Sequence, residues 1–118
     1  MPKVTFEIPA DDLTRAVKFY EDVFGWSSLK LPFEHALVDA SGKPVNPATS
    51  DGGITKRRDK VQSPVLIITV DSIEEAAEKV KRSGGQIIVE KTKVGEFGHS
   101  SYIKDTEGNV ICMWGEIK

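Results

Sequence analysis

The sequence predicts an α+β fold made of two tandem βαβββ modules, whose mixed, curved sheets form a concave cavity. The first observation is an internal repeat. A short apolar strand, an aspartate and an amphipathic helix recur about sixty positions later in a chain of 118 residues. The second observation is that the repeated positions agree in size or role. The matched pairs are Phe6/Leu66, Ile8/Ile68, Asp11/Asp71, Leu13/Ile73, Ala16/Ala76, Val17/Ala77, Tyr20/Val80 and Gly25/Gly85.

One such unit is too small to bury both the back of its strands and the apolar face of its helix. We therefore expect the two copies to pack together as a single domain over 1–118 and to leave a hollow, which is where we look for function. Module 1 covers about 1–58 and module 2 about 63–118, with a short polar linker between them.

The first half begins with a strand over 3–9, because apolar and polar residues alternate there. Asp11 and Asp12 follow and provide a helix N-cap. The apolar stripe of that helix ends at Gly25, which suits a left-handed C-terminal cap. The remaining segments are strands at about 26–31 and 34–40, a loop at 41–51 and a strand that opens at 52–55.

The second half begins at 65–70, which is apolar on both faces and is therefore expected to be buried on both. Asp71 is the expected cap of the second helix, and Gly84 with Gly85 ends it. The stripe of this helix is Ile73, Ala76, Ala77 and Val80. Strands are expected at 86–90, 100–104 and 109–114, with a turn at 105–108.

The composition excludes several classes of partner. The net charge is −2 and the cationic stretch at 56–60 is short, so we expect no nucleic acid. No apolar run is long enough to cross a membrane, and the N-terminus lacks the apolar segment of a signal peptide. We expect a cytoplasmic protein without a membrane partner. The single cysteine, Cys112, excludes an internal disulfide and a multi-thiolate metal cluster within one chain.

Several segments together resemble one family. They are 6–12 (FEIPADD), 19–26 (FYEDVFGW), 52–54 (GGI), 70–73 (VDSI) and 104–110 (KDTEGNV). They are similar to the glyoxalase, bleomycin-resistance and ring-cleaving dioxygenase superfamily, also called vicinal oxygen chelate proteins. The resemblance extends over the whole chain and implies a glyoxalase-like fold and a homodimer. It does not identify a reaction, because this fold supports many chemistries.

The resemblance also bears on metal binding. Family members that use a metal hold it with His, Gln or Glu near the middle of the first and last strand of each half. The corresponding positions here are Thr5, Gly52, Val65 and Cys112. Gly52 and Val65 offer no side-chain lone pair to a divalent ion. We therefore predict no metal and no cofactor, with a divalent metal on atypical ligands as the alternative.

Glu7 is the main catalytic candidate. Strand alternation puts Thr5 and Glu7 on one face and Phe6 and Ile8 on the other, which must cover the helix. A partly desolvated carboxylate facing the hollow could abstract a proton next to a carbonyl. The other interpretation is that Glu7 pairs with a lysine or arginine and serves the structure. Both interpretations remain open.

The two histidines belong to no metal-binding pattern. His99, in the loop 95–99 expected at the mouth of the cavity, is a second catalytic candidate. His35 is interpreted mainly as a polar residue at the start of a strand. The expected ligand-binding residues are Thr5, Val65, Ile67, Phe97, Cys112 and Trp114. The alternative for Cys112 is that it only fills the core. For the aromatic residues it is that they fill the core or a dimer contact.

Three functions compete. The first is a metal-free cavity that binds a small, partly apolar molecule, with the loop 41–51 as a lid. The second is an enzyme of the lyase, isomerase or dioxygenase type. It would use either atypical metal ligands or acid/base chemistry through Glu7. The third is an interaction module whose hollow is filled by side chains. We favour the first, and the identity of the ligand is not predicted.

Overall fold

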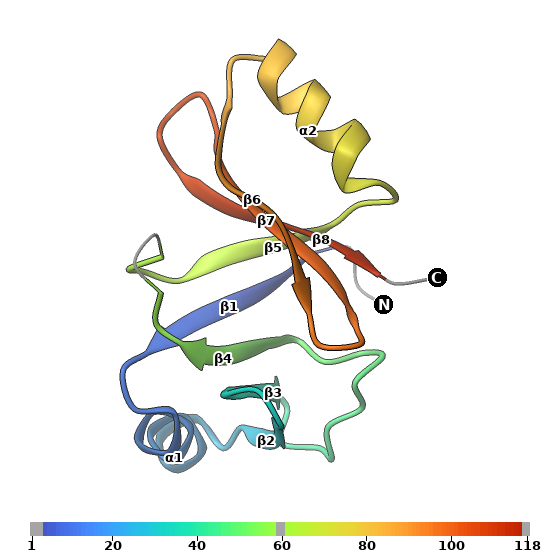
Figure 1. The fold of residues 1–118 in the computed structure, drawn as a ribbon. Helices are drawn as coiled ribbons and strands as arrows, with labels where there is room; N and C mark the ends of the chain where they lie inside the picture. The colour runs from blue at the N-terminus through green and yellow to red at the C-terminus, as the bar shows by residue number, and fades with distance from the viewer. Residues whose placement is uncertain (1–3, 59–60, 117–118) are drawn as a thin grey trace. The chain divides into compact units, whose positions relative to one another are not determined.

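The computed structural model describes residues 4–58 and 61–116 and is drawn in Figure 1. The chain divides into two compact units, Met1–Pro64 and Val65–Lys118. Each unit contains one strand, one helix and three further strands, in that order. The predicted α+β fold is therefore confirmed. Lys3, where the first strand was expected to begin, lies outside the described residues.

The N-terminal unit is a four-stranded mixed sheet with one helix (Figure 1). Its elements are β1 (Val4–Ala10), α1 (Leu13–Phe24), β2 (Ser27–Leu31), β3 (His35–Asp39) and β4 (Gly52–Lys56). The strand order within this unit is β2-β3-β4-β1. The pair β1 and β4 is parallel, whereas β3 is antiparallel to both β2 and β4.

Helix α1 begins and ends at the residues that the sequence indicates. The carboxylate of Asp12, the N-cap, accepts a hydrogen bond from the backbone N–H of Arg15 at 3.0 Å. Gly25 closes the helix in the left-handed conformation with φ 72°, and its N–H donates to the carbonyl of Glu21. Both caps satisfy backbone groups that a helix end otherwise leaves unpaired.

The core of the N-terminal unit lies between α1 and one face of the sheet. Its buried centre is Ala10, Val38 and Ile54. Partly buried residues pack around it: Phe6, Ile8, Leu13, Ala16, Val17, Tyr20 and Trp26. Because successive side chains of a strand point to opposite faces, the residues between these lie on the other side of the sheet. We call that side, in each unit, the helix-free face.

The C-terminal unit has the same element order. Its elements are β5 (Val65–Thr69), α2 (Ile73–Arg82), β6 (Gln86–Val94), β7 (Gly98–Lys104) and β8 (Val110–Glu116). The strand order within it is β5-β8-β7-β6, with β5 and β8 parallel. The core is Ile73, Ile103 and Met113, surrounded by Val70, Ala76, Ala77, Val80, Ile87 and Ile111. The predicted stripe of the second helix therefore faces this core.

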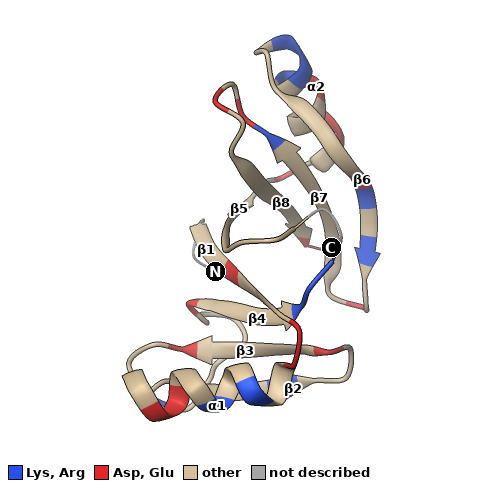
Figure 2. Ribbon diagram, turned by 90° about the vertical axis from the view of Figure 1, so that its left-hand side faces the viewer, with Lys and Arg blue, Asp and Glu red and all other residues tan. Residues whose placement is uncertain are grey.

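The cap of α2 corrects one prediction. Ser72, and not Asp71, is the N-cap, and its hydroxyl accepts from the backbone N–H of Glu75 at 3.2 Å. Ser72 with Glu75 has the spacing of a capping box, in which a serine is followed three residues later by a glutamate. Acidic residues in the first turn and basic residues in the last complement the helix dipole (Figure 2).

The prediction for the first strand of the second half is also wrong. The segment 65–70 was expected to be buried on both faces, but Leu66 is 51% exposed and Ile68 is 37% exposed. Both lie in register with Ile111 and Met113, on the side of the sheet that carries α2. Helix α2 packs over β6, β7 and β8, and so leaves this part of β5 uncovered.

Neither described helix is long and apolar enough to cross a membrane.

Candidate functional site

Glu7 lies on the helix-free face of the N-terminal unit. Phe6 and Ile8, its neighbours in β1, pack against the core under α1, so the side chain of Glu7 points the other way. Glu7 is only 5% exposed. Its register partner in β4 is Gly53, which has no side chain to fill the space beside it. Thr5, two residues earlier, is partly buried on the same face.

The space above Gly53 is taken by His35 from β3. A Cβ atom built on Gly53 would lie 2.5 Å from the Nε2 atom of His35, closer than real Cβ contacts allow. Phe33 stacks on the imidazole, with ring centroids 5.8 Å apart and an interplanar angle of 24°. Sequence analysis gave His35 little weight. The glycine pair at 52–53 was the signal for a side chain lying close over β4, because a strand glycine often marks such an approach.

The turn before β3 helps to hold His35 in this position. Glu34 adopts a left-handed backbone with φ 42°, which is unusual for a residue other than glycine. Its carbonyl accepts a hydrogen bond from the backbone N–H of Lys56 at 3.1 Å. Strained backbone of this kind is held in place by surrounding contacts. The turn is therefore tied to the end of β4, the strand next to β1, which carries Glu7.

His35 is neutral at physiological pH. Burial, and in second place the positive charge of Arg58, lower the pKa of His35 to about 4. A neutral imidazole carries one N–H donor and one acceptor nitrogen. The helix-free face of this unit thus brings a buried carboxyl group and a neutral imidazole to neighbouring positions around Gly53.

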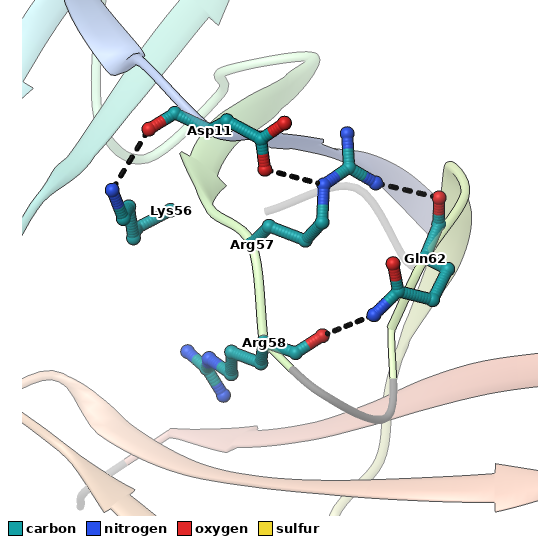
Figure 3. A network of polar contacts seen from close by, with 5 residues as sticks. All are labelled: Asp11, Lys56, Arg57, Arg58 and Gln62. Carbon is teal, nitrogen blue, oxygen red and sulfur yellow. Dashed lines mark hydrogen bonds and ion pairs between the residues drawn. The ribbon is translucent and has the colours of Figure 1, made fainter.

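A polar network holds the chain where it leaves β4 (Figure 3). The guanidinium of Arg57 donates to the carboxylate of Asp11 at 2.9 Å and to the carbonyl of Gln62 at 2.6 Å. Lys56 donates to the carbonyl of Asp11 at 2.8 Å, and Gln62 donates to the carbonyl of Arg58 at 3.1 Å. The network ties the end of β1 to the segment after β4. It therefore also fixes the backbone of Arg58, whose charge acts on His35.

The helix-free face of the C-terminal unit carries the other candidates. Ile111 and Met113 pack in the core, so Cys112 and Trp114 point to the opposite face. Cys112 is 2% exposed and lies in register with Ile67 of β5 and Tyr102 of β7. Its thiol lies 3.6 Å from the carbonyl of Met113, a contact typical of a structural cysteine.

Trp114 has a neighbour that sequence analysis missed. Ser100 of β7 is its register partner and is 4% exposed. The Ser100 hydroxyl and the Trp114 indole nitrogen are both buried, and neither has a hydrogen-bond partner among the described residues. Buried polar groups are paired in nine cases of ten or more, so two adjacent exceptions need an explanation. Nothing local marks Ser100 in the sequence, where Ser101 stands beside it.

Two predicted site residues lie elsewhere. His99 is in strand β7, not in a loop, and alternation puts it on the face of Ile103, which packs in the core under α2. It lies near Glu74 in the first turn of α2. His99 is therefore on the opposite face from Cys112 and Trp114. Phe97 is in the turn before β7 and is 49% exposed.

A surface depression of about 410 Å³ lies on α2, lined by Glu75, Glu78, Lys79 and Arg82. These residues are the charged, solvent side of the helix, and none is a predicted site residue. The concave cavity expected from the sequence stays a prediction.

Comparison with known proteins decides the family. The profile of the Glyoxalase/Bleomycin resistance protein/Dioxygenase superfamily matches residues 4–113. The chain belongs to this superfamily. A glyoxylase-like domain-containing protein of Didymella fabae is 32% identical to it over 115 residues, which are 90% of this chain and 88% of that protein.

Two further proteins are more distantly similar to the chain. The putative glyoxylase CFP32 of Mycobacterium bovis is 24% identical over 92% of this chain, which spans only 43% of that protein. The crystal structure of methylmalonyl-CoA epimerase from Mycobacterium tuberculosis superposes with a TM-score of 0.70 and 16% identity. That superposition covers 98% of this chain and 89% of the epimerase chain. At this identity the epimerase shows a common fold and no more.

The residues at the superfamily's metal positions do not fit a divalent ion. A Cβ on Gly52 would point at Phe6, on the helix side, so the β4 position beside Glu7 is Gly53. The spacing of the internal repeat is therefore not constant. Glu7 and Gly53 are register partners in the first unit, as Ile67 and Cys112 are in the second, but Ile67 follows Glu7 by 60 positions and Cys112 follows Gly53 by 59. Glycine remains at that position, and Val65 has no lone pair. Among the described residues, no three His, Cys, Asp or Glu side chains are grouped to hold a metal.

Proposed function

We propose that the chain binds a small, partly apolar molecule on its helix-free faces and does so without a resident metal ion. One observation carries the proposal: polar side chains are buried on these faces, away from the helices. They are Glu7, Thr55 and Ser100, each between 4% and 6% exposed. Binding sites for small molecules are mostly apolar surfaces with a few placed polar groups, which is the composition found here.

The metal-free part of the proposal rests on donor chemistry. The positions that correspond to ligands in metal-dependent relatives carry the hydroxyl of Thr5, the hydrogen of Gly53, the isopropyl group of Val65 and the thiol of Cys112. A divalent ion needs an oxygen, imidazole or thiolate donor from the side chain at such positions. Two of the four offer no donor at all.

The test combines metal content with thermal shift. Elemental analysis of protein purified without chelators should find less than stoichiometric zinc, nickel, iron and manganese. A thermal-shift screen should find small aromatic or thiol-conjugate compounds that raise Tm, because a ligand that binds only the folded state stabilises it. Strong stabilisation by one of these ions at stoichiometric amounts would contradict the metal-free proposal. A screen without any stabilising compound would contradict ligand binding.

A second function is favoured by one specific observation. His35 lies over Gly53, beside the buried Glu7, and is neutral at neutral pH. A carboxylate with a neutral imidazole beside it can move a proton at a carbon next to a carbonyl group. The carboxylate takes the proton, and the imidazole donates a hydrogen bond to the oxygen that gains charge. This is the acid/base chemistry of an isomerase or lyase.

Proton exchange tests this second function directly. Carbonyl compounds with an acidic α-hydrogen, methylmalonyl-CoA among them, are incubated with the protein in D₂O and followed by NMR. Faster exchange that is lost in Glu7→Gln and reduced in His35→Gln would support it. Exchange that is equal with Glu7→Gln and with the unaltered protein would exclude a catalytic Glu7.

The homodimer also remains a proposal. It is supported by large apolar side chains that are exposed in each unit, namely Phe19, Val23 and Phe24 on α1 and Leu66 and Ile68 on β5. Scattered exposed apolar residues are normal, but groups of them mark association surfaces. Sedimentation velocity at several concentrations should give twice the mass of one 13.0 kDa chain. A monomer at every concentration would refute it.

A further inference from the structure

The C-terminal unit contains two buried polar groups that face the same side of the sheet. Ser100 in β7 and Trp114 in β8 are direct register partners of an antiparallel pair. Such partners have their Cβ atoms about 4.5 to 5.5 Å apart. The hydroxyl of Ser100 and the indole nitrogen of Trp114 have no hydrogen-bond partner among the described residues. Ser100 itself is 4% exposed.

The indole ring of Trp114 leans toward β7, which carries Ser100. A Cβ atom built on Gly98 would lie 2.8 Å from the Cζ2 atom of the ring. Cζ2 is two bonds from Nε1, so the edge of the indole that carries the N–H lies over β7. The absence of a side chain at Gly98 therefore leaves room for the ring beside the neighbouring strand. This geometry brings the indole N–H and the Ser100 hydroxyl to the same region.

The neighbouring serine shows that the chain pairs a buried hydroxyl where its role is structural. Ser101 is 1% exposed, lies on the helix side, and donates to the carbonyl of Val89 at 2.7 Å. Ser100 has no such arrangement. An unpaired buried donor weakens the folded state, because the group loses its hydrogen bonds to water without replacement. Two unpaired groups side by side, on the face that the proposed function uses, indicate a partner from outside the chain.

We propose that the Ser100 hydroxyl and the Trp114 indole N–H form a donor pair that binds the carbonyl oxygen of an uncharged small molecule. The proposal rests on the proposed function and names the class of ligand for it. An indole N–H can only donate, and a serine hydroxyl can donate to the same oxygen, so the pair selects an acceptor. A carbonyl oxygen has two lone pairs and can accept both bonds.

The residues around the pair favour an uncharged ligand. The charged residue that shares this face in β8 is Glu116, which is exposed at the end of the strand and is an anion, so it also disfavours an anionic ligand. The positions nearest the pair in β5, β7 and β8 are uncharged. They are Ile67, Thr69, Tyr102 and Cys112. Burying a carboxylate among such residues is unfavourable unless a cation pairs with it, whereas a ketone, aldehyde or amide needs only hydrogen bonds. The body of the ligand contacts the apolar side chains of Ile67 and Cys112.

The test uses three matched compounds and the indole N–H signal of Trp114. The probes are acetophenone, which has the carbonyl, ethylbenzene, which lacks it, and benzoate, which carries a charge. In a ¹H–¹⁵N spectrum the two indole signals belong to Trp26 and Trp114, and the Trp114→Phe variant assigns them. We expect acetophenone to shift the Trp114 signal downfield, and to bind at least five-fold more tightly than either analogue.

Two serine variants provide the matched control. Ser100→Ala removes the proposed donor and should weaken acetophenone binding at least three-fold, while Ser101→Ala, on the other face, should leave it unchanged. Equal binding of acetophenone and ethylbenzene, or an unaltered affinity in Ser100→Ala, overturns the donor pair. So does the absence of a Trp114 shift with acetophenone and with a set of uncharged ketones and amides at millimolar concentration. If the thermal-shift screen still yields ligands, only this inference fails; if it yields none, the proposed function fails too.

Discussion

The imidazole of His35 occupies the place of the side chain that Gly53 lacks. Its Nε2 atom lies 2.5 Å from the position of a Cβ on Gly53, whose register partner in β1 is Glu7. Three strands thus contribute one residue each to a small area of the helix-free face. The absence of a side chain in the middle strand is what lets the imidazole lie over β4, next to the strand that carries Glu7.

Gly53→Ala should therefore destabilise the protein. The added methyl group must displace His35, and overpacking of this kind costs about 1–3 kcal/mol of the free energy of unfolding. Urea denaturation measures the loss. The double variant His35→Ala/Gly53→Ala is the control, because removal of the imidazole makes room for the methyl group. Additive effects of the two substitutions would show that the residues do not contact each other.

His35 should also make stability depend on pH. Its pKa is lowered to about 4 in the folded protein by burial and by Arg58, and is about 6.5 in an unfolded chain. Between these values the unfolded state binds a proton that the folded state does not. The free energy of unfolding is therefore unaffected above pH 6.5 and falls as the pH drops toward 4, by at most about 3 kcal/mol.

Urea denaturation of the unaltered protein and of His35→Gln at several pH values isolates this effect. The difference in the free energy of unfolding between the two proteins should change across the window from pH 6.5 to 4. A difference that is constant over that window would mean that His35 does not titrate with a lowered pKa.

The neighbouring serines of β7 should respond in opposite ways to alanine. Ser101→Ala removes a hydrogen bond to the carbonyl of Val89 and leaves that carbonyl with one partner fewer, at a cost of about 1–2 kcal/mol. Ser100→Ala removes a hydroxyl that lacks a partner among the described residues, so stability should be unchanged or higher. Thermal unfolding without ligand compares them. A large loss of stability in Ser100→Ala would reveal an intramolecular role for its hydroxyl.

The N-cap of α2 is a further test. Ser72→Ala removes the hydrogen bond to the N–H of Glu75 and should lower the free energy of unfolding by about 1 kcal/mol. Asp71→Ala, one residue earlier, should have a smaller effect. Chemical denaturation measures the free energy of unfolding of both variants. A larger loss in Asp71→Ala than in Ser72→Ala would show that Asp71 is the N-cap.

Local patterns predicted the elements because each pattern depends on near neighbours. The stripe that ends at Gly25 predicted α1, and its left-handed φ of 72° follows from the need for a C-terminal cap. Alternation placed Glu7 on the face away from the helix, and the packing of Phe6 and Ile8 around the core agrees. The α2 cap was misplaced by one residue because serine and aspartate both cap helices.

The exposure of apolar residues in β5 could not be predicted from the sequence pattern alone. Leu66 and Ile68 are apolar, but α2 covers only the three other strands of its unit. Whether an apolar side chain is covered depends on where the helix lies on the sheet. The residues of β5 do not indicate where α2 lies on the sheet.

The sequence by itself determined the family, the α+β fold, the order of the elements and the face on which Glu7 lies. Only the tertiary structure decided which residues meet: His35 with Gly53, and Ser100 with Trp114. The physical reason is that strand register joins residues far apart in the chain, and a shift of one position moves a side chain to the other face. The alternation of side chains along one strand does not determine its register with the next strand, so the sequence placed Gly52 at the position that Gly53 occupies.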